Sequence, residues 1–282
     1  MSGKIDPVLF KTREELGIGS SIKLKIVEGD KDMCFDMALE ILDEIKANNE
    51  AGRKTVFIWP VGPVGQYPIL VMLINRYKVS MKNVHVFQMD EYLDDDLKPI
   101  PLTNPLSFTA HVLRYNSMID AALRIPENQI HVPTPGREAF IWDRIQELGG
   151  VDTALGGIGI NGHIAFNEPP EPDEAVSDEE FKTWPTRILK ITRETRTINS
   201  NTATKGAIDL IPEMIITIGM KEILSARRIR FYMNREWQCG IARKVLHGPV
   251  TRFVPASYFQ QHQDARLTIT ETVAQPPMGA LR

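Results

Sequence analysis

The chain has 282 residues, and 43% of them are hydrophobic, which is enough for a large α/β domain with a buried core. The formal net charge of −3 gives no general attraction to nucleic acid or to acidic membranes, so we expect a small-molecule partner and neither of those two. The first residues carry no apolar signal core, and the two cysteines, Cys34 and Cys239, lack a C-x-x-C spacing; we therefore expect a cytoplasmic protein with reduced thiols and no metal site.

Short apolar runs alternate with segments of helical spacing along most of the chain. We predict strands at residues 22–27, 55–59, 84–89, 129–132, 151–155, 187–191, 214–218, 228–233 and 267–272. We predict helices at residues 30 to about 48, 66–77, 108–114, 118–123, 137–148 and 236–246. This alternation indicates an α/β fold, a mostly parallel sheet with helices on both faces.

The domain organisation follows from the lack of an internal repeat or a clear linker. We expect one Rossmann-like domain over residues 1–282, with residues 1–21 as an N-terminal extension. Residues 169–185 are acidic and rich in proline, which indicates a lid or a surface excursion. The acidic run at residues 94–96 is interpreted as a solvated loop rather than a metal site, because nothing fixes its geometry.

The clearest candidate for a functional site is the sequence GGIGINGHIAFNEP at residues 156–169. It follows a predicted strand, and its glycines let the backbone turn sharply and approach a ligand. His163 and Glu168 lie within one short segment that Pro169 prevents from continuing as a long helix. An imidazole and a carboxylate near one loop suit proton transfer.

Two other interpretations of this segment remain open. Gly157, Gly159 and Gly162 fit the G-x-G-x-x-G pattern of dinucleotide-binding proteins, but that pattern needs a helix that begins at its last glycine. The prolines at 169 and 170 leave little room for such a helix. The other alternative is a glycine-rich turn in which His163 is hydrogen-bonded and carries no chemistry.

Two further strands end in residues that we expect near His163. The strand at 55–59 leads into the loop of residues 61–65, and the strand at 84–89 ends at Asp90. Because ligands of parallel sheets bind beyond the carboxyl ends of the strands, we expect the loop, Asp90 and His163 to surround one cavity.

Three motifs in this order resemble those of the glucosamine-6-phosphate deaminase/isomerase family, to which the 6-phosphogluconolactonases are related. They are Met89-Asp90-Glu91-Tyr92, residues 157–169, and Glu194-Thr195-Arg196 with Asn199-Ser200. The resemblance extends over about residues 23–262. It implies an enzyme that needs no metal or organic cofactor and that acts on a sugar or sugar phosphate. Related enzymes often form oligomers, so we expect a homo-oligomer.

The resemblance also implies roles for individual residues. Asp90 would move a proton between C1 and C2 of the opened amino sugar, His163 would help to open the pyranose ring, and Glu168 would orient His163. The substrate-binding positions would be Val61, Gly62, Gly65, Glu91, Gly159, Asn161, Arg196 and Asn201.

Several positions depart from the family pattern, mostly where the sugar phosphate would bind. The hydroxyl residues usual at Val61 and Val64 are missing, and Pro63 has no N–H to donate. Asn161 replaces an aspartate, Asn201 replaces an arginine, and the lysine expected after the strand that ends near Met233 is not apparent. These departures predict altered specificity at the phosphate end of the substrate. The residues considered for a rearranged anion site, each with a structural ion pair as the alternative, are Arg187, Arg193, Arg196 and Arg235.

The leading hypothesis is therefore an amino-sugar deaminase/isomerase with altered specificity. The alternatives are a catalytically inactive sugar-binding homologue and a sugar-lactone hydrolase.

Overall fold

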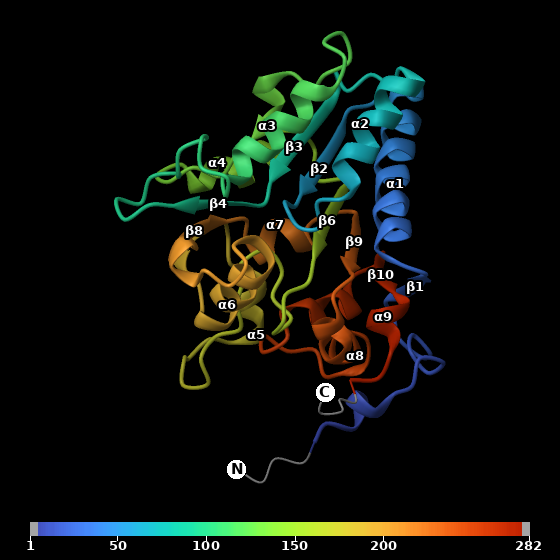
Figure 1. Ribbon diagram of the computed structural model, residues 1–282, viewed down its shortest axis with the longest axis vertical. Helices are drawn as coiled ribbons and strands as arrows, with labels where there is room; N and C mark the ends of the chain where they lie inside the picture. The colour runs from blue at the N-terminus through green and yellow to red at the C-terminus, as the bar shows by residue number, and fades with distance from the viewer. Residues whose placement is uncertain (1–4, 278–282) are drawn as a thin grey trace.

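The computed structural model describes residues 5–277, and its strands form two sheets (Figure 1). The larger sheet has seven strands in the order β1-β10-β9-β6-β2-β3-β5, and all of its pairings are parallel. Its members are β1 (Lys23–Val27), β2 (Thr55–Trp59), β3 (Val84–Gln88), β5 (Ile130–His131), β6 (Thr153–Gly157), β9 (Arg228–Met233) and β10 (Ala265–Thr270). The predicted α/β fold with a mostly parallel sheet is confirmed.

Helices cover both faces of this sheet because successive strand residues point to opposite sides. In β2, for example, Phe57 packs into the core on one face and Ile58 into the core on the other. The first core is covered by α1 (Asp30–Glu50), α2 (Gln66–Tyr77) and α3 (Phe108–Met118). The second is covered by α4 (Glu138–Glu147), α7 (Met220–Leu224), α8 (Cys239–His247) and α9 (Glu271–Ala274).

A small antiparallel sheet, which the sequence did not predict, stands beside the large one. Its order is β4 (Asp90–Leu93), β8 (Met214–Thr217) and β7 (Arg187–Lys190). The chain passes from β3 into β4 at Met89, whose N–H donates to the carbonyl of Trp59 in β2 and whose carbonyl accepts from the N–H of Ile218, just after β8. Met89 thus joins the two sheets and carries Asp90 out of the parallel sheet.

The predicted helices and strands differ from the structure at several positions. The helix expected at 118–123 is absent, because α3 continues to Met118 and the chain then turns. The last strand ends at Thr270, where α9 begins, instead of at residue 272. Helix α6 (Arg193–Ala203) was not predicted, because it is mostly polar and buries only Thr195 and Ser200.

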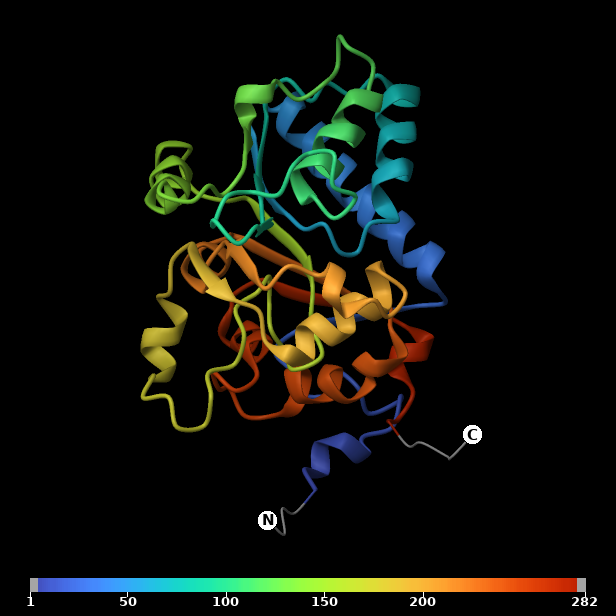
Figure 2. The same ribbon diagram turned by 60° about the vertical axis from the view of Figure 1, so that its left-hand side comes forward.

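The acidic segment 169–185 runs along one side of the molecule (Figure 2). It contains α5 (Asp178–Lys182), which begins after Ser177, whose hydroxyl accepts from the N–H of Glu180. Phe181 is fully buried in the core, and the Asp178 carboxylate accepts from the hydroxyl of Tyr258. The segment is therefore anchored to the body of the protein.

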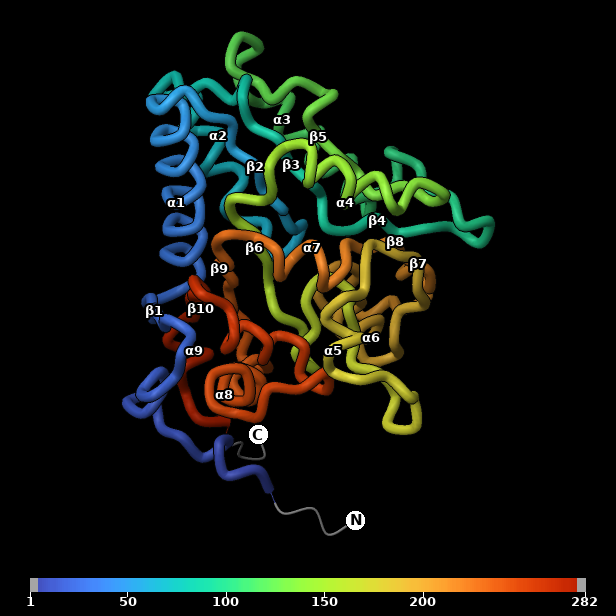
Figure 3. The backbone as a smooth tube through the Cα atoms, turned by 180° about the vertical axis from the view of Figure 1, so that it is seen from behind, coloured from blue at the N-terminus to red at the C-terminus, as the bar shows by residue number. Residues whose placement is uncertain are grey.

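The N-terminal segment lies beside α8 and the last described residues (Figure 3). Arg243 of α8 is fully buried and donates to the carbonyls of Lys11, Cys239 and Ala274 at 2.8–2.9 Å. One guanidinium thus joins the N-terminal segment, α8 and α9.

Both cysteines are buried free thiols. None of the helices within residues 5–277 combines the length and the apolar character needed to cross a bilayer.

Replacing Arg243 with Met is expected to lower the free energy of unfolding by about 2–4 kcal/mol, because three buried carbonyls would lose a charged donor. Urea unfolding measures the change. Lys244→Met at the neighbouring, partly exposed position is the control, with an expected change within about 0.5 kcal/mol. Equal stability of the two variants would contradict the joining role of Arg243.

Candidate active site

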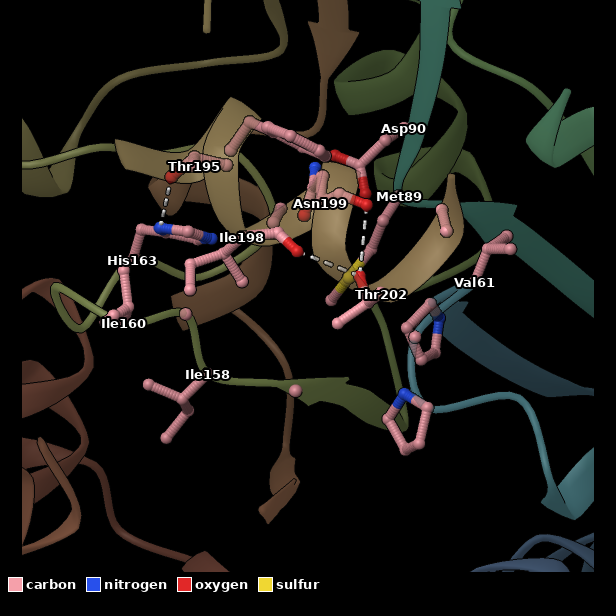
Figure 4. Close-up of a pocket in the computed structure, with 18 of the residues that line it drawn as sticks. Val61, Met89, Asp90, Ile158, Ile160, His163, Thr195, Ile198, Asn199 and Thr202 are labelled. Atoms are coloured by element: carbon pink, nitrogen blue, oxygen red, sulfur yellow. Dashed lines mark hydrogen bonds between the residues drawn. The ribbon is translucent and has the colours of Figure 1, made fainter. Parts of the chain in front are cut away.

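A cavity of about 290 Å³ lies at the carboxyl ends of β2, β6 and β9 and beside the start of β4 (Figure 4). The sequence-predicted site residues that line it are Val61, Gly62, Asp90, Gly159 and His163. Helix α6 closes another side with Thr195, Asn199 and Thr202. Segments more than 100 residues apart in the sequence therefore meet around one space.

Asp90 contributes a carboxylate that is only 6% exposed. The hydroxyl of Thr217 donates to its Oδ1 at 2.5 Å. Burial raises the pKa of Asp90 to about 7, although the hydrogen bond from Thr217 and the proximity of His163 act in the opposite direction. Near neutral pH this group can therefore both accept and return a proton, as a general base must.

His163 is held on one side of its ring by three polar residues. Asn161 Oδ1 lies 2.8 Å from His163 Nδ1, Glu168 Oε2 lies 3.1 Å from it, and the Thr195 hydroxyl lies 3.4 Å from it. Because the first two are acceptors, we assign the ring proton to Nδ1, which leaves the lone pair of Nε2 free to accept a proton.

The Glu168 side chain is buried, and its neighbours stabilise its ionised form. Burial alone would raise the pKa of Glu168, but the neighbouring His163 and hydrogen bonds from Thr195 and Asn161 lower it to about 2. Asn161 Nδ2 donates to Glu168 Oε2 at 2.7 Å, and Asn161 Oδ1 also accepts from the backbone N–H of His163 at 3.1 Å. The amide of Asn161 therefore links the carboxylate to the imidazole without adding a charge.

Gly159 is required by the position of the imidazole. A Cβ atom built on Gly159 would lie 2.0–2.4 Å from ring atoms of His163, far inside van der Waals contact. The glycine thus makes room for the histidine ring. No helix begins at Gly162, and the chain turns between residues 162 and 168 instead, so the geometry that a dinucleotide-binding loop requires is absent from this segment.

Five predicted substrate-binding residues do not line the cavity. One of them, Asn161, belongs with Glu168 to the His163 cluster behind the cavity wall. The fully buried Glu91 carboxylate accepts from the hydroxyl of Ser107 and from the N–H groups of Phe108 and Thr109, so it fixes the start of α3. Gly65 packs against Cys34, whose Sγ lies 2.5 Å from a Cβ built on the glycine.

The other two lie on α6. Arg196 donates to the Glu213 carboxylate at 2.9 Å and to the carbonyl of Ile211 at 3.0 Å, and Asn201 is exposed. Of the four arginines considered for an anion site, only Arg235 lines the cavity. Arg187 donates to Asn167 Oδ1 at 2.6 Å and stacks on Trp184.

Some residues of the site were missed at the sequence level. Thr195 and Asn199 stand in the third motif, so the motif itself could have indicated them. Thr217 had no local signal, because its contact with Asp90 depends on the pairing of two strands distant in sequence.

Within residues 5–277, no group of three or more His, Cys, Asp or Glu side chains is arranged to hold a metal ion.

No protein-family model matches the sequence. A glucosamine-6-phosphate deaminase of Lachnoclostridium phytofermentans is 33% identical over 212 residues, which are 72% of this chain and 80% of that protein. The chain belongs to the glucosamine-6-phosphate deaminase family.

Other members of the glucosamine-6-phosphate deaminase family align over more of the chain. The deaminase of Clostridium perfringens strain SM101 is 28% identical over 261 residues, which are 90% of this chain and 98% of that protein. Among solved structures, a monomeric glucosamine-6-phosphate deaminase has a TM-score of 0.75 at 24% identity and covers 90% of this chain and 99% of its own. A 6-phosphogluconolactonase from Trypanosoma cruzi has a TM-score of 0.65 at 12% identity, with 90% and 96% covered, so it shares the fold.

The departures from the pattern of the glucosamine-6-phosphate deaminase family can now be placed. Val61 and Pro63 line the cavity, so the missing hydroxyl and N–H face the space where a ligand would lie. Asn161 lies within the His163 cluster. Asn201 lies on the exposed side of α6. The departures at Val61 and Pro63 therefore alter the wall of the cavity itself.

Asp90→Asn is expected to stabilise the protein at pH 8 by about 2 kcal/mol, because one unit of pKa is worth about 1.4 kcal/mol and the amide pairs imperfectly with its neighbours. The folded pKa of about 7 lies above the ordinary value of 3.8, so ionisation of Asp90 costs folding energy as the pH rises from about 4 to 7. At pH 4 the carboxyl of Asp90 is protonated in the folded protein, so the variant and wild type should have nearly the same free energy of unfolding.

Urea unfolding at both pH values measures this effect. Asp95→Asn in the exposed loop is the control, and it should leave stability unchanged at either pH. If Asp90→Asn is no more stable than wild type at pH 8, burial does not raise the pKa of Asp90.

Proposed function

We propose that this protein is an amino-sugar deaminase/isomerase, with Asp90 as the proton-transfer base and His163 and Glu168 as the ring-opening pair. The observation that carries the proposal is that Asp90 and His163 face the same cavity in the states that this chemistry requires. A carboxylate with a pKa near 7 and an imidazole with a free Nε2 are both suited to move protons at neutral pH.

Ring opening is the first step. His163 Nε2 takes the proton of the C1 hydroxyl as the bond between C1 and the ring oxygen breaks. His163 then returns that proton to the ring oxygen. C1 becomes an aldehyde. Glu168, ionised at neutral pH, and Asn161 keep the proton on His163 Nδ1 and so present Nε2 to the sugar.

Isomerisation follows at C1 and C2. Asp90 removes the proton from C2 while O1 takes a proton from solvent, which gives an enolamine. Asp90 then returns its proton to C1, which converts the amine at C2 into a protonated imine. Water then adds to C2 and ammonia leaves, which gives the ketose. Asp90 must be ionised to begin this step, so activity should rise as the pH passes through about 7.

Asp90→Asn should abolish incorporation of solvent deuterium at substrate C1 and C2, because an amide cannot take the C2 proton. Proton NMR in D₂O measures the exchange, and a binding assay should still detect the sugar. Sustained exchange in the variant would rule out Asp90 as the base.

We also propose that the substrate does not carry a phosphate bound as in the rest of the family. Val61 offers no hydroxyl and Pro63 no N–H, and Arg196 is already paired with Glu213. Hydrogen bonds to a charged group contribute about 1.5–3 kcal/mol each, so losing two lowers affinity by at least about a hundredfold. The substrate is then an amino sugar without phosphate, or one whose anionic group lies near Arg235.

The double variant Val61→Thr/Pro63→Gly restores one hydroxyl and one N–H to this wall. Its KM for a phosphorylated amino sugar should fall by about tenfold or more, since each 1.4 kcal/mol is a factor of ten. Steady-state kinetics measure it, and the KM for the same sugar without phosphate, which should not change, is the control. An equal change for both sugars would show that the wall does not contact the phosphate position.

The other activities of this fold give different products. Ammonia release from amino sugars supports the deaminase proposal, whereas acid release from sugar lactones would identify a lactone hydrolase. Binding of a sugar without either product would identify an inactive sugar-binding homologue. Sugars and lactones with and without phosphate belong in the same panel.

A further inference from the structure

Thr217 is the last residue of β8, the middle strand of the small antiparallel sheet. In β8 it lies opposite Asp90 of β4 on one side and opposite Arg187 of β7 on the other. It is fully buried, and it does not line the cavity. Any influence of Thr217 on the reaction must therefore pass through the groups that it contacts.

The Thr217 hydroxyl makes two hydrogen bonds that join two parts of the active site. It donates to Asp90 Oδ1 at 2.5 Å and accepts from the backbone N–H of Phe166 at 3.1 Å. The carbonyl of Ile218 lies farther away, at 3.4 Å, so we assign the hydroxyl proton to Asp90. One oxygen atom thus connects the base to the segment that carries His163 and Glu168.

The segment 163–168 is also fixed to the end of β8 independently of that hydroxyl. The side-chain amide of Asn167 donates to the carbonyls of Ile164 and Ile218, both at 2.9 Å, and its Oδ1 accepts from Arg187. These bonds would persist without the hydroxyl. Loss of the hydroxyl should therefore act mainly on Asp90 and leave the loop in place.

We propose that Thr217 is a positioning residue for the base: it engages Oδ1 of Asp90, leaves Oδ2 for the substrate, and sets the separation of Asp90 from His163. The inference rests on the proposed function. Within residues 5–277, no hydrogen bond to Oδ2 of Asp90 is formed, and the residue lines the cavity. A carboxylate with one occupied and one free oxygen presents its basic lone pair in one direction only.

The same hydrogen bond affects the charge of Asp90. The other ionisable groups near it are Glu91 and Tyr92 on its own strand and His163 across the cavity, and burial is the main cause of its raised pKa. A donated hydrogen bond favours the ionised form, so removing it should raise the pKa of Asp90 further.

Thr217→Val tests the proposal, because it keeps the shape and removes the hydroxyl. The acid limb of the kcat profile should move from about pH 7 to higher pH by about one unit. The ionised fraction of Asp90 at pH 7 then falls from about one half to about one eleventh, so kcat at pH 7 should fall about fivefold with little change in KM. Thr217→Ser should restore the wild-type acid limb and the wild-type kcat at pH 7. Thr270→Val is the matched control, since it removes a buried strand hydroxyl that has no hydrogen-bond partner among the described residues.

A second measurement does not depend on turnover. The carboxyl carbon of Asp90, followed by 13C NMR, should titrate at higher pH in Thr217→Val than in wild type or Thr270→Val. An unchanged titration together with an unchanged kcat would overturn the positioning role. If wild type turns over no sugar while the NMR shift is present, the proposed function fails and the link between Thr217 and Asp90 stands.

If Thr217→Val does not fold, Thr217→Cys replaces it, since a thiol is a much weaker donor than a hydroxyl. Its profile should lie on the high-pH side of that of Thr217→Ser. Identical profiles for the two would also overturn the proposal.

Discussion

The pairing of β4 with β8 is the constraint on which the rest of the active site depends. It places Asp90 opposite Thr217, 127 residues away in the sequence, and carries the carboxylate out of the parallel sheet toward the loop of His163. Met89 makes this possible by bonding to the large sheet through its N–H and to the residue after β8 through its carbonyl. Without that junction, β3 would simply end at the sheet edge.

The surroundings of the two buried carboxylates, Asp90 and Glu168, shift their pKa values in opposite directions. Burial dominates for Asp90, which has one neutral donor, and its pKa rises to about 7. Glu168 is also buried, but His163, Thr195 and Asn161 together lower its pKa to about 2. One group is therefore ready to exchange a proton and the other stays ionised to hold an imidazole, a separation that general acid–base chemistry needs. The burial that destabilises ionised Asp90 also brings its pKa close to neutral, as its proposed role as a base requires.

The sequence predicted what depends on periodicity and on sheet topology. The central strands are continuous apolar runs, and the rule that ligands bind beyond strand ends correctly brought Val61, Asp90 and His163 to one cavity. It could not predict β4 or α6, because both are short or polar and acquire their structure from distant partners. It also could not show that Glu91 turns inward to cap α3, since adjacent strand residues point to opposite sides and only the pairing decides which side faces the cavity.

The arrangement of charges supports the proposed deaminase/isomerase over an inactive sugar-binding homologue. A site that had lost its activity would be expected to lose proton-transfer groups as readily as anion contacts. Asp90, His163 and Glu168 are all present, and Glu168 Oε2 lies 3.1 Å from His163 Nδ1. The pKa of Asp90 is raised to about 7 and that of Glu168 is lowered to about 2. Arg196, by contrast, donates to the Glu213 carboxylate and to the carbonyl of Ile211. Moving that guanidinium to the cavity would break those bonds, so Arg196 is held away from the cavity, whereas Arg235 lines it.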